Sequence, residues 1–384
     1  MAMIAAVLVV AVAALIGLVS YWPGERTIER PENLRTLETE RAEVVGVELT
    51  TCPGPANQDC WRVTAELESG PDAGERVRFT MLTAETDFDV GDDIRVYKNP
   101  VPEEAVTAQG IRVDPYGFSD FERRAPLGWL AAAFAVLVLL AGRWQGLRAL
   151  AGLAASLALI VLFIVPSILE GNDPTGVALT GALAVMLVTI FLAHGVSFKT
   201  LAASLGTTVS LLLTVVLADA FTGIAHLSGV SSDEAIFLRA TQGDISLQGL
   251  LLAGMVIGAL GVLDDLTVSQ ASTVMALRRA NPSLGFRALF RSALDVGRDH
   301  ITATVNTLVL AYAGASLPIL LVFSLADTSL SDAVNFEAVA EEIIAMLVGS
   351  IGLITAVPVT TALAALLAAS VEPARLEGEH AHAH

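Results

Sequence analysis

Apolar blocks separated by short polar loops make up most of the chain. One block opens the sequence, and further blocks follow Pro126. Each is close to the ~20 residues that a helix needs to cross the hydrocarbon of a bilayer. The pattern therefore predicts about eight transmembrane helices. They lie near residues 3–20, 127–142, 147–169, 175–194, 200–220, 247–268, 301–325 and 342–369.

The first block ends at Tyr21 and Trp22, an aromatic pair typical of a membrane interface. No Lys or Arg precedes the block, and no A-x-A cleavage site follows it. These features favour an uncleaved anchor over a signal peptide. We therefore expect residues 1–22 to form an N-terminal transmembrane anchor.

Apolar and polar residues alternate in residues 23–125, after a charged linker. An alternation of period two is typical of half-buried strands, and clusters of Gly, Pro and Asp separate the runs. We expect a small antiparallel β-barrel or sandwich of the OB-like type. The apolar positions of these runs are Val44, Val45, Val47, Leu49, Trp61, Val63, Ala65, Leu67, Val77, Phe79, Met81, Phe88, Val90, Ile94 and Val96.

The composition agrees with a membrane protein. Only 16% of the residues are charged, against about a quarter in a soluble domain. The net charge of −18 argues against nucleic acid as a partner, because a phosphate backbone requires clusters of Lys and Arg. The acidic residues form either a solvated exterior or a surface that attracts cations.

Cys52 and Cys60 are the two cysteines of the chain, and both lie in the predicted β domain. A close pair in a β segment can close a short loop as a disulfide, which fits an oxidising compartment. Two free thiols are the alternative. A zinc site needs more ligands than this segment offers, so we expect no metal there.

Basic residues set the expected orientation, because cytoplasmic loops carry an excess of Lys and Arg. Loop 277–300 holds five arginines, more than any other loop between the predicted helices. We place this loop in the cytoplasm, which puts the β domain outside and the C-terminus inside. Arg26 and Arg30 lie on the outer side, but Glu25 and Glu29 directly precede them, and the larger loop has more weight.

Two segments carry a resemblance to a known family. GALGVLDDLTVSQAS (258–272) and LFRSALDVGRDHITATVNTLVLAYAG (289–314) resemble the YibE/F family of multispanning bacterial membrane proteins. SFKTLAASLGT (197–207) and VDPYGFSDFERR (113–124) are similar to the same family. The resemblance covers the membrane part fully and the β domain loosely. It implies a polytopic protein of the bacterial plasma membrane, and it carries over no catalytic residue.

Asp264 and Asp265 follow an apolar run that begins at Leu250. A helix of about 14 residues places them ~21 Å along its axis. A charge in hydrocarbon costs several kcal/mol, so such a residue usually faces protein or a water path. We predict a cation or proton site here; the alternative is a membrane span that ends just before the pair and leaves both carboxylates at the cytoplasmic interface. Adjacent helical residues point about 100° apart, so the two face different neighbours.

The next apolar block begins with polar residues. Hydroxyl and amide groups enter it on Thr302, Thr304, Asn306 and Thr307. Such groups either bond neighbouring helices together or line a polar path. If they line a path, Asn306 and Thr307 meet Asp264 and Asp265, and these four form the candidate intramembrane site.

Asp295, Arg298 and Asp299 precede this block and share a helix face, because they are three or four residues apart. Arg298 can therefore bridge both carboxylates. His300, a residue type often used in switches, opens the block. The cluster is either an ion-pair network that fixes the cytoplasmic loop or a gate that opens when its pairs break.

Histidines also end the chain, where His380, His382 and His384 follow Glu377 and Glu379. Alternating histidines can capture a transition metal, but a structureless tail is the simpler interpretation, and we expect no cofactor. The chain contains no G-x-x-x-x-G-K-[ST] loop, nucleophile elbow or H-E-x-x-H motif. We therefore do not expect an enzyme.

The predicted architecture is an α-helical polytopic membrane protein with a small extracytoplasmic β domain. Its parts are an anchor (1–22), a linker with the β domain (23–125), a seven-helix YibE/F-like membrane domain (126–370) and a cytoplasmic tail with histidines (371–384).

The leading functional hypothesis is a permease or channel-like transporter for an ion or small solute in the plasma membrane. One alternative is the transmembrane subunit of a larger complex of ABC type, with a partner membrane protein or a cytoplasmic ATPase. The other is a membrane scaffold or sensor that uses the β domain for recognition. The expected surroundings are the lipid bilayer, without nucleic acid.

Overall fold

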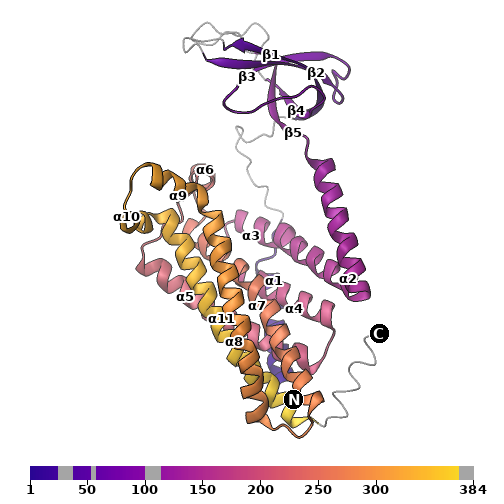
Figure 1. The fold of residues 1–384 in the computed structure, drawn as a ribbon, viewed down its shortest axis with the longest axis vertical. Coiled ribbons are helices and arrows are strands. Elements are labelled where there is room, and N and C mark those ends of the chain that lie inside the picture. Colours follow the sequence, from indigo (N-terminus) through magenta and orange to yellow (C-terminus); the bar gives the residue numbers. More distant parts are fainter. Residues whose placement is uncertain (25–37, 53–57, 100–113, 372–384) are drawn as a thin grey trace. The chain divides into compact units, whose positions relative to one another are not determined.

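A computed structural model describes residues 1–24, 38–52, 58–99 and 114–371 of the chain (Figure 1). Two compact units divide the chain. One comprises Met1–Ile28 with Val138–His384 and is helical, and the other comprises Glu29–Leu137 and contains the sheet. The C-terminal histidines and the Arg26 and Arg30 flank of the first helix lie outside the described residues.

The sheet unit is a five-stranded antiparallel sheet in the order β3-β2-β1-β4-β5. Sequence neighbours pair in the hairpins β1–β2, β2–β3 and β4–β5, while β4 returns to pair with β1. The strands are β1 (Thr39–Thr51), β2 (Asp59–Leu67), β3 (Arg76–Leu82), β4 (Asp93–Lys98) and β5 (Tyr116–Phe121).

The alternating residues bury one face of this sheet, as their period predicts. Its core contains Val44, Val63, Phe79 and Ile94, each no more than 2% exposed. Leu49 was expected among them but is 63% exposed, because it lies near the end of β1, past the last buried residue of that strand.

The sheet curls so that its two edge strands approach each other. Phe79 of β3 and Phe118 of β5 stack with ring centroids 6.1 Å apart, and Phe88 packs edge-on against Phe118 at 5.0 Å. The result is a half-barrel. Cys52 and Cys60 form a disulfide next to the ends of β1 and β2, and the amide of Cys52 also donates to the carbonyl of Gln58 at 2.8 Å.

An ion-pair cluster joins the last strand to the chain that follows it. Glu122 accepts hydrogen bonds from Arg124 Nη2 at 2.8 Å and from Arg95 Nη1 at 3.1 Å. The hydrogen bond from Arg124 and, with a smaller effect, that from Arg95 lower the pKa of Glu122 to about 2. This carboxylate therefore stays charged at neutral pH and fixes Arg95, which also bonds Thr39 of β1.

The remaining described elements are helical. Six helical segments are long and apolar enough to cross a membrane, or seven if the bent pair α8 and α9, which meet at 56°, counts as one. The helices are α1 (Ala2–Ser20), α2 (Arg124–Leu159), the π-helix η2 (Ile160–Ile164), α3 (Val165–Leu169), α4 (Pro174–His194), α5 (Phe198–Ile224), α6 (Asp233–Thr241), α7 (Leu247–Ala280), α8 (Phe286–Ala315), α9 (Leu317–Leu325), α10 (Leu330–Asn335) and α11 (Glu337–Ser370).

Two of the predicted spans, 127–142 and 147–169, are parts of one helical stretch of 46 residues in α2, η2 and α3. Arg143 interrupts this stretch with φ 49° and ψ −123°. On its far side the backbone of Gly146 lies directly against that of Val138, with no room for a Cβ atom. The chain therefore reverses at this point, which is where the sequence places a loop.

The first helix is part of the helical unit. Ala14 is 3% exposed in the main core, and Gly17 faces Thr180 of α4 so closely that a Cβ would lie 2.6 Å from its Oγ1. Beyond the helix, the amide of Gly24 donates to Glu170 Oε2 at 2.9 Å. Helix α1 therefore packs against other helices of the helical unit and is more than an anchor for the sheet unit.

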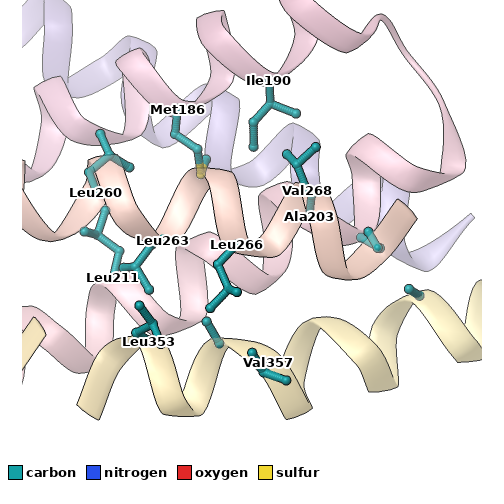
Figure 2. Packing of buried hydrophobic residues seen from close by; sticks show 14 of the residues in the cluster. Met186, Ile190, Ala203, Leu211, Leu260, Leu263, Leu266, Val268, Leu353 and Val357 are labelled. Carbon is teal, nitrogen blue, oxygen red and sulfur yellow. The ribbon is translucent and has the colours of Figure 1, made fainter. Parts of the chain in front are cut away.

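Helix α7 lies between α4, α5 and α11 and supplies the centre of the core. Figure 2 shows Leu263 and Leu266 of α7 directed towards Leu211 of α5 and Leu353 of α11, while Met186 of α4 approaches from the other side. All of these side chains are at most 2% exposed. The arrangement holds α7 on several sides and fixes which of its residues face open space.

Two reciprocal contacts bring α5 and α11 together. Gly206 of α5 receives the side chain of Thr360 of α11, and Gly352 of α11 receives that of Thr214 of α5. The two contacts run in opposite chain directions, so the helices are antiparallel. Close approach through small residues is the usual way in which membrane helices associate. Three glycines of α7 differ from these: Gly254 and Gly261 have no atom within 4 Å of a Cβ position, and Gly258 has only the hydroxyl of Tyr312, at 3.6 Å.

We predict that Gly206→Ala destabilises the helical unit, because the new methyl group overlaps Thr360. Overpacking of this kind costs about 1–3 kcal/mol. The measurement is the thermal unfolding midpoint of the purified protein in detergent. Gly254→Ala is the matched control and should unfold at or above the wild-type midpoint, since alanine favours the helix. Equal midpoints for Gly206→Ala and wild type would contradict the assigned α5–α11 contact.

Candidate functional site

Helix α7 continues without a break through Asp264 and Asp265 to Ala280. Asp264 lies about halfway along its 34 residues, ~26 Å from the N-terminal end at the usual rise per residue. The helix itself therefore does not end before the pair. Leu263 and Leu266 flank the pair and are buried in the core.

The carboxylate of Asp264 has one satisfied and one unsatisfied oxygen. Its Oδ2 accepts a hydrogen bond from Thr189 Oγ1 of α4 at 2.8 Å, and the carbonyl of Val185 competes for the same proton at 2.9 Å. Its Oδ1 is buried and has no hydrogen-bond partner in the described part of the chain. A buried charged acceptor without a partner costs free energy, so an atom in this position calls for a ligand, water or proton.

The unsatisfied oxygen belongs to a residue that lines a cavity of about 380 Å³. Small-molecule sites typically fall between about 300 and 1,000 Å³. Five of the lining residues carry polar side chains: Ser156, Thr189, His194, Asp264 and Asp265. The others are Ala149, Gly152, Leu153, Ile160, Ile164, Ala182, Val185, Ile190, Ala193, Ile257, Leu260, Gly261 and Val268.

One wall of the cavity comes from the helix that follows Arg143. Gly152 and Ser156 of α2 line it, and the hydroxyl of Ser156 donates to the carbonyl of Gly152 at 2.9 Å. Ile160 and Ile164 continue the wall from the π-helix η2. Wide turns of this kind occur mostly as local bulges, frequently at functional sites. Here the wide turn coincides with a cavity wall.

Asp265 lines the same cavity but is exposed, whereas Asp264 is only partly exposed. The two carboxylates therefore have different surroundings, as their angular separation on the helix predicts. Gly261, one turn earlier, also faces the cavity and leaves its side open. His194 lies on the wall at the last residue of α4.

Asn306 and Thr307 do not join this site. Both are exposed on α8, and neither lines the cavity. Thr307 Oγ1 donates to the carbonyl of Ala303 in its own helix at 3.0 Å. The predicted convergence fails because Asn306 and Thr307 lie on an exposed side of α8, whereas Val305 and Leu308 face the bundle, Leu308 against Gly349 of α11.

The predicted ion-pair cluster is only partly formed. Arg298 Nη1 pairs with Asp295 Oδ1 at 2.8 Å, and both side chains are about 70% exposed. Within the described ranges, Asp299 and His300 form no ion pair, so Arg298 does not bridge two carboxylates. An exposed pair of this kind stabilises a protein by at most about 1 kcal/mol. The cluster is a solvated surface feature in this state.

Residues that sequence analysis did not select bind the helices together through polar contacts. Gln270 of α7 is 2% exposed and donates from Nε2 to the carbonyl of Ala293 at 2.8 Å and to Thr361 Oγ1 at 2.7 Å. Thr207 and Thr267 share a hydrogen bond of 2.6 Å between α5 and α7. An amide inside an apolar stretch was a signal for Gln270, but a threonine hydroxyl alone did not distinguish Thr189.

The described part of the chain contains no group of three or more His, Cys, Asp or Glu side chains arranged to hold a metal ion. The terminal histidines are not part of that search. The site is a partly apolar cavity lined by Asp264, whose carboxylate has one buried oxygen without a partner in the described part of the chain.

Comparison with known proteins identifies one family model. The model, described as YibE/F-like protein, matches residues 130–370 and so covers more than half of the chain. The matched range contains the cavity, Asp264 and the buried glutamine. No curated protein and no solved structure matches the chain.

We predict that Thr189→Val destabilises the protein, because it removes the hydrogen-bond donor to Asp264 Oδ2 and leaves both carboxylate oxygens without a protein partner. The loss of such a partner costs about 1–3 kcal/mol. Thr189→Ser keeps the hydroxyl and serves as the control. Thermal unfolding in detergent measures both. If valine and serine unfold at the same temperature, the hydroxyl does not hold Asp264.

Proposed function

We propose, from the premise that this chain belongs to the YibE/F-like family, that it is a membrane transport protein, a permease or channel-like carrier for a small cationic solute or ion. The observation that carries the proposal is the unsatisfied Oδ1 of Asp264 at a cavity in the middle of a long apolar helix. The proposal assigns it no enzymatic chemistry.

A carboxylate at this position has a free-energy cost that a transported cation offsets. Acidic side chains within membrane helices are rare and mark ion or substrate pathways. Thr189 stabilises one oxygen, and the bound solute would satisfy the other. A site that is incomplete without its solute binds it, yet releases it more readily than a fully formed ion cage would.

The proposal places the helical unit in the bacterial plasma membrane. Six apolar segments, the break at Arg143 and the bent pair α8 and α9 together accommodate eight crossings. The five arginines of loop 277–300 support a cytoplasmic location for this loop. The disulfide of Cys52 with Cys60 supports an oxidising, extracytoplasmic location for the half-barrel, which we propose to be OB-like.

Assembly into a larger complex is the second candidate. Arg287 and Arg291 are exposed on the first turns of α8 and would face the cytoplasm in this orientation. A cytoplasmic ATPase or a partner membrane protein with an acidic surface would fit there. Co-purification of an ATPase with the native protein would favour this candidate, and a sensor role would instead require binding at the half-barrel.

The orientation predicts which loops an impermeant maleimide labels in intact spheroplasts. Ala326→Cys, in the loop before α10, should be labelled, whereas Ser283→Cys, before α8, should react only after the membrane is permeabilised. Both residues are exposed, and the native cysteines are disulfide-bonded. The reverse labelling pattern would contradict the proposed orientation.

The transport proposal predicts cation-driven currents from the purified protein in liposomes on a solid-supported membrane. A panel of sodium, potassium and alkylammonium jumps should produce a transient current in wild type that falls at least tenfold in Asp264→Asn. The physical reason is that a neutral amide removes the charge but keeps the shape of the side chain.

Asp219→Asn is the control for this measurement. Asp219 also lies on a helix long enough to span the membrane, but it is exposed and outside the cavity. Its variant should retain the wild-type current. Currents of equal size in wild type and Asp264→Asn, or no current in wild type, would reject the transport proposal.

A further inference from the structure

The side chains that line the cavity favour one kind of cation. This inference rests on the proposed function. The cavity offers few groups that can bind a positive charge. Asp264 Oδ1 is the buried oxygen without a partner, while Oδ2 already accepts from Thr189. Ser156 Oγ already donates to the carbonyl of its own helix. A ligand therefore meets one strong acceptor, with the exposed carboxylate of Asp265 at the cavity edge.

Bare divalent metal ions do not suit such a site. Ca²⁺ takes about six to eight oxygen ligands, and Mg²⁺ requires about six in octahedral geometry. A cavity walled by aliphatic side chains supplies neither number. A transition metal would need imidazole or thiolate ligands, and His194 is the one such side chain in the lining.

The walls instead suit an apolar body. Leu153, Ile160, Ile164, Ile257 and Leu260 present aliphatic surface around the acceptor. Burying the hydrocarbon part of a ligand against these walls is favourable because it removes apolar surface from water. The volume of about 380 Å³ exceeds what a single dehydrated ion occupies and accommodates a small organic molecule.

The lining also distinguishes between kinds of organic cation. Quaternary ammonium groups are typically recognised by aromatic cages. No Phe, Tyr or Trp is among the lining residues. A single carboxylate oxygen without a donor is satisfied best by an N–H group, because a charge-assisted hydrogen bond is both directional and strong.

We propose that the cavity binds a protonated alkyl amine. Its ammonium N–H donates to Asp264 Oδ1, and its hydrocarbon part packs against the aliphatic walls from α2, η2 and α7. Gly261 gives the hydrocarbon part space beside the carboxylate, because no atom lies within 4 Å of its Cβ position. The substrate class is thus a small amphipathic primary or secondary amine.

The test compares three probes of one shape on the purified full-length protein in nanodiscs. They are 1-adamantylamine, its N,N,N-trimethyl analogue and 1-adamantanol, measured by equilibrium dialysis with empty nanodiscs subtracted. The amine should bind at least tenfold more tightly than either analogue, since one charge-assisted hydrogen bond is worth a factor of about ten or more. Tighter binding of the quaternary analogue or of the alcohol would overturn the proposal.

Two variants locate the binding. Asp264→Asn should weaken binding of the amine at least tenfold, and Asp219→Asn should leave it unchanged. Gly261→Leu should also abolish amine binding by filling the cavity, while its unfolding midpoint stays near wild type, because the new side chain enters open space. Unaltered amine binding in Asp264→Asn or in Gly261→Leu would place the amine elsewhere and overturn the proposal.

The current and binding measurements together distinguish failure of the amine assignment from failure of the transport proposal. An Asp264-dependent current carried by sodium or potassium, without amine binding, would overturn the amine assignment and retain the transport function. If no cation in the panel produces a current and no amine binds, both are rejected. An amine that binds through Asp264 and also carries current supports both.

Discussion

The structure depends on the burial of a carboxylate inside an apolar helix bundle. Asp264 lies midway along α7, between Leu263 and Leu266, which are almost fully buried. Charge at such a position is costly unless it is paired or hydrogen-bonded. Thr189 offsets part of this cost at one oxygen, and a cavity adjoins the carboxylate. A proposed function follows from the oxygen that the protein leaves without a partner.

The rest of the helical unit explains how this arrangement persists. Helices α5 and α11 interlock through Gly206 with Thr360 and through Gly352 with Thr214, and α7 lies against both. Gln270 adds a buried hydrogen bond from α7 to each of two neighbouring helices. One side of α7 is thereby held rigidly. Its glycine-lined side remains open, and Asp265 lies on that side.

Periodicity and length predicted the large features of the chain. The alternation in residues 44–96 identified β1 to β4, and the length of the apolar run placed Asp264 within a helix, because both depend on local sequence. The alternation did not identify β5, and Phe88 and Val90 lie outside the strands. Long-range packing was less accessible. Asn306 and Thr307 were expected at the site, but α8 is mostly exposed beyond its first turns. Gly254, Gly258 and Gly261 recur at four and three residues, the spacing of a packing motif, yet only Gly258 has a neighbour, Tyr312 of α8, while Gly206 has no comparable pattern.

The donor to the carboxylate illustrates the same limit, since Thr189 is one of many threonines in apolar helices and only the packing of α4 on α7 selects it.

The central claim is that Asp264 itself contacts the solute. Infrared difference spectroscopy on solute addition tests this most directly. The account predicts a shift of a carboxyl band in wild type that is missing from Asp264→Asn. Identical difference spectra for the two proteins would contradict it.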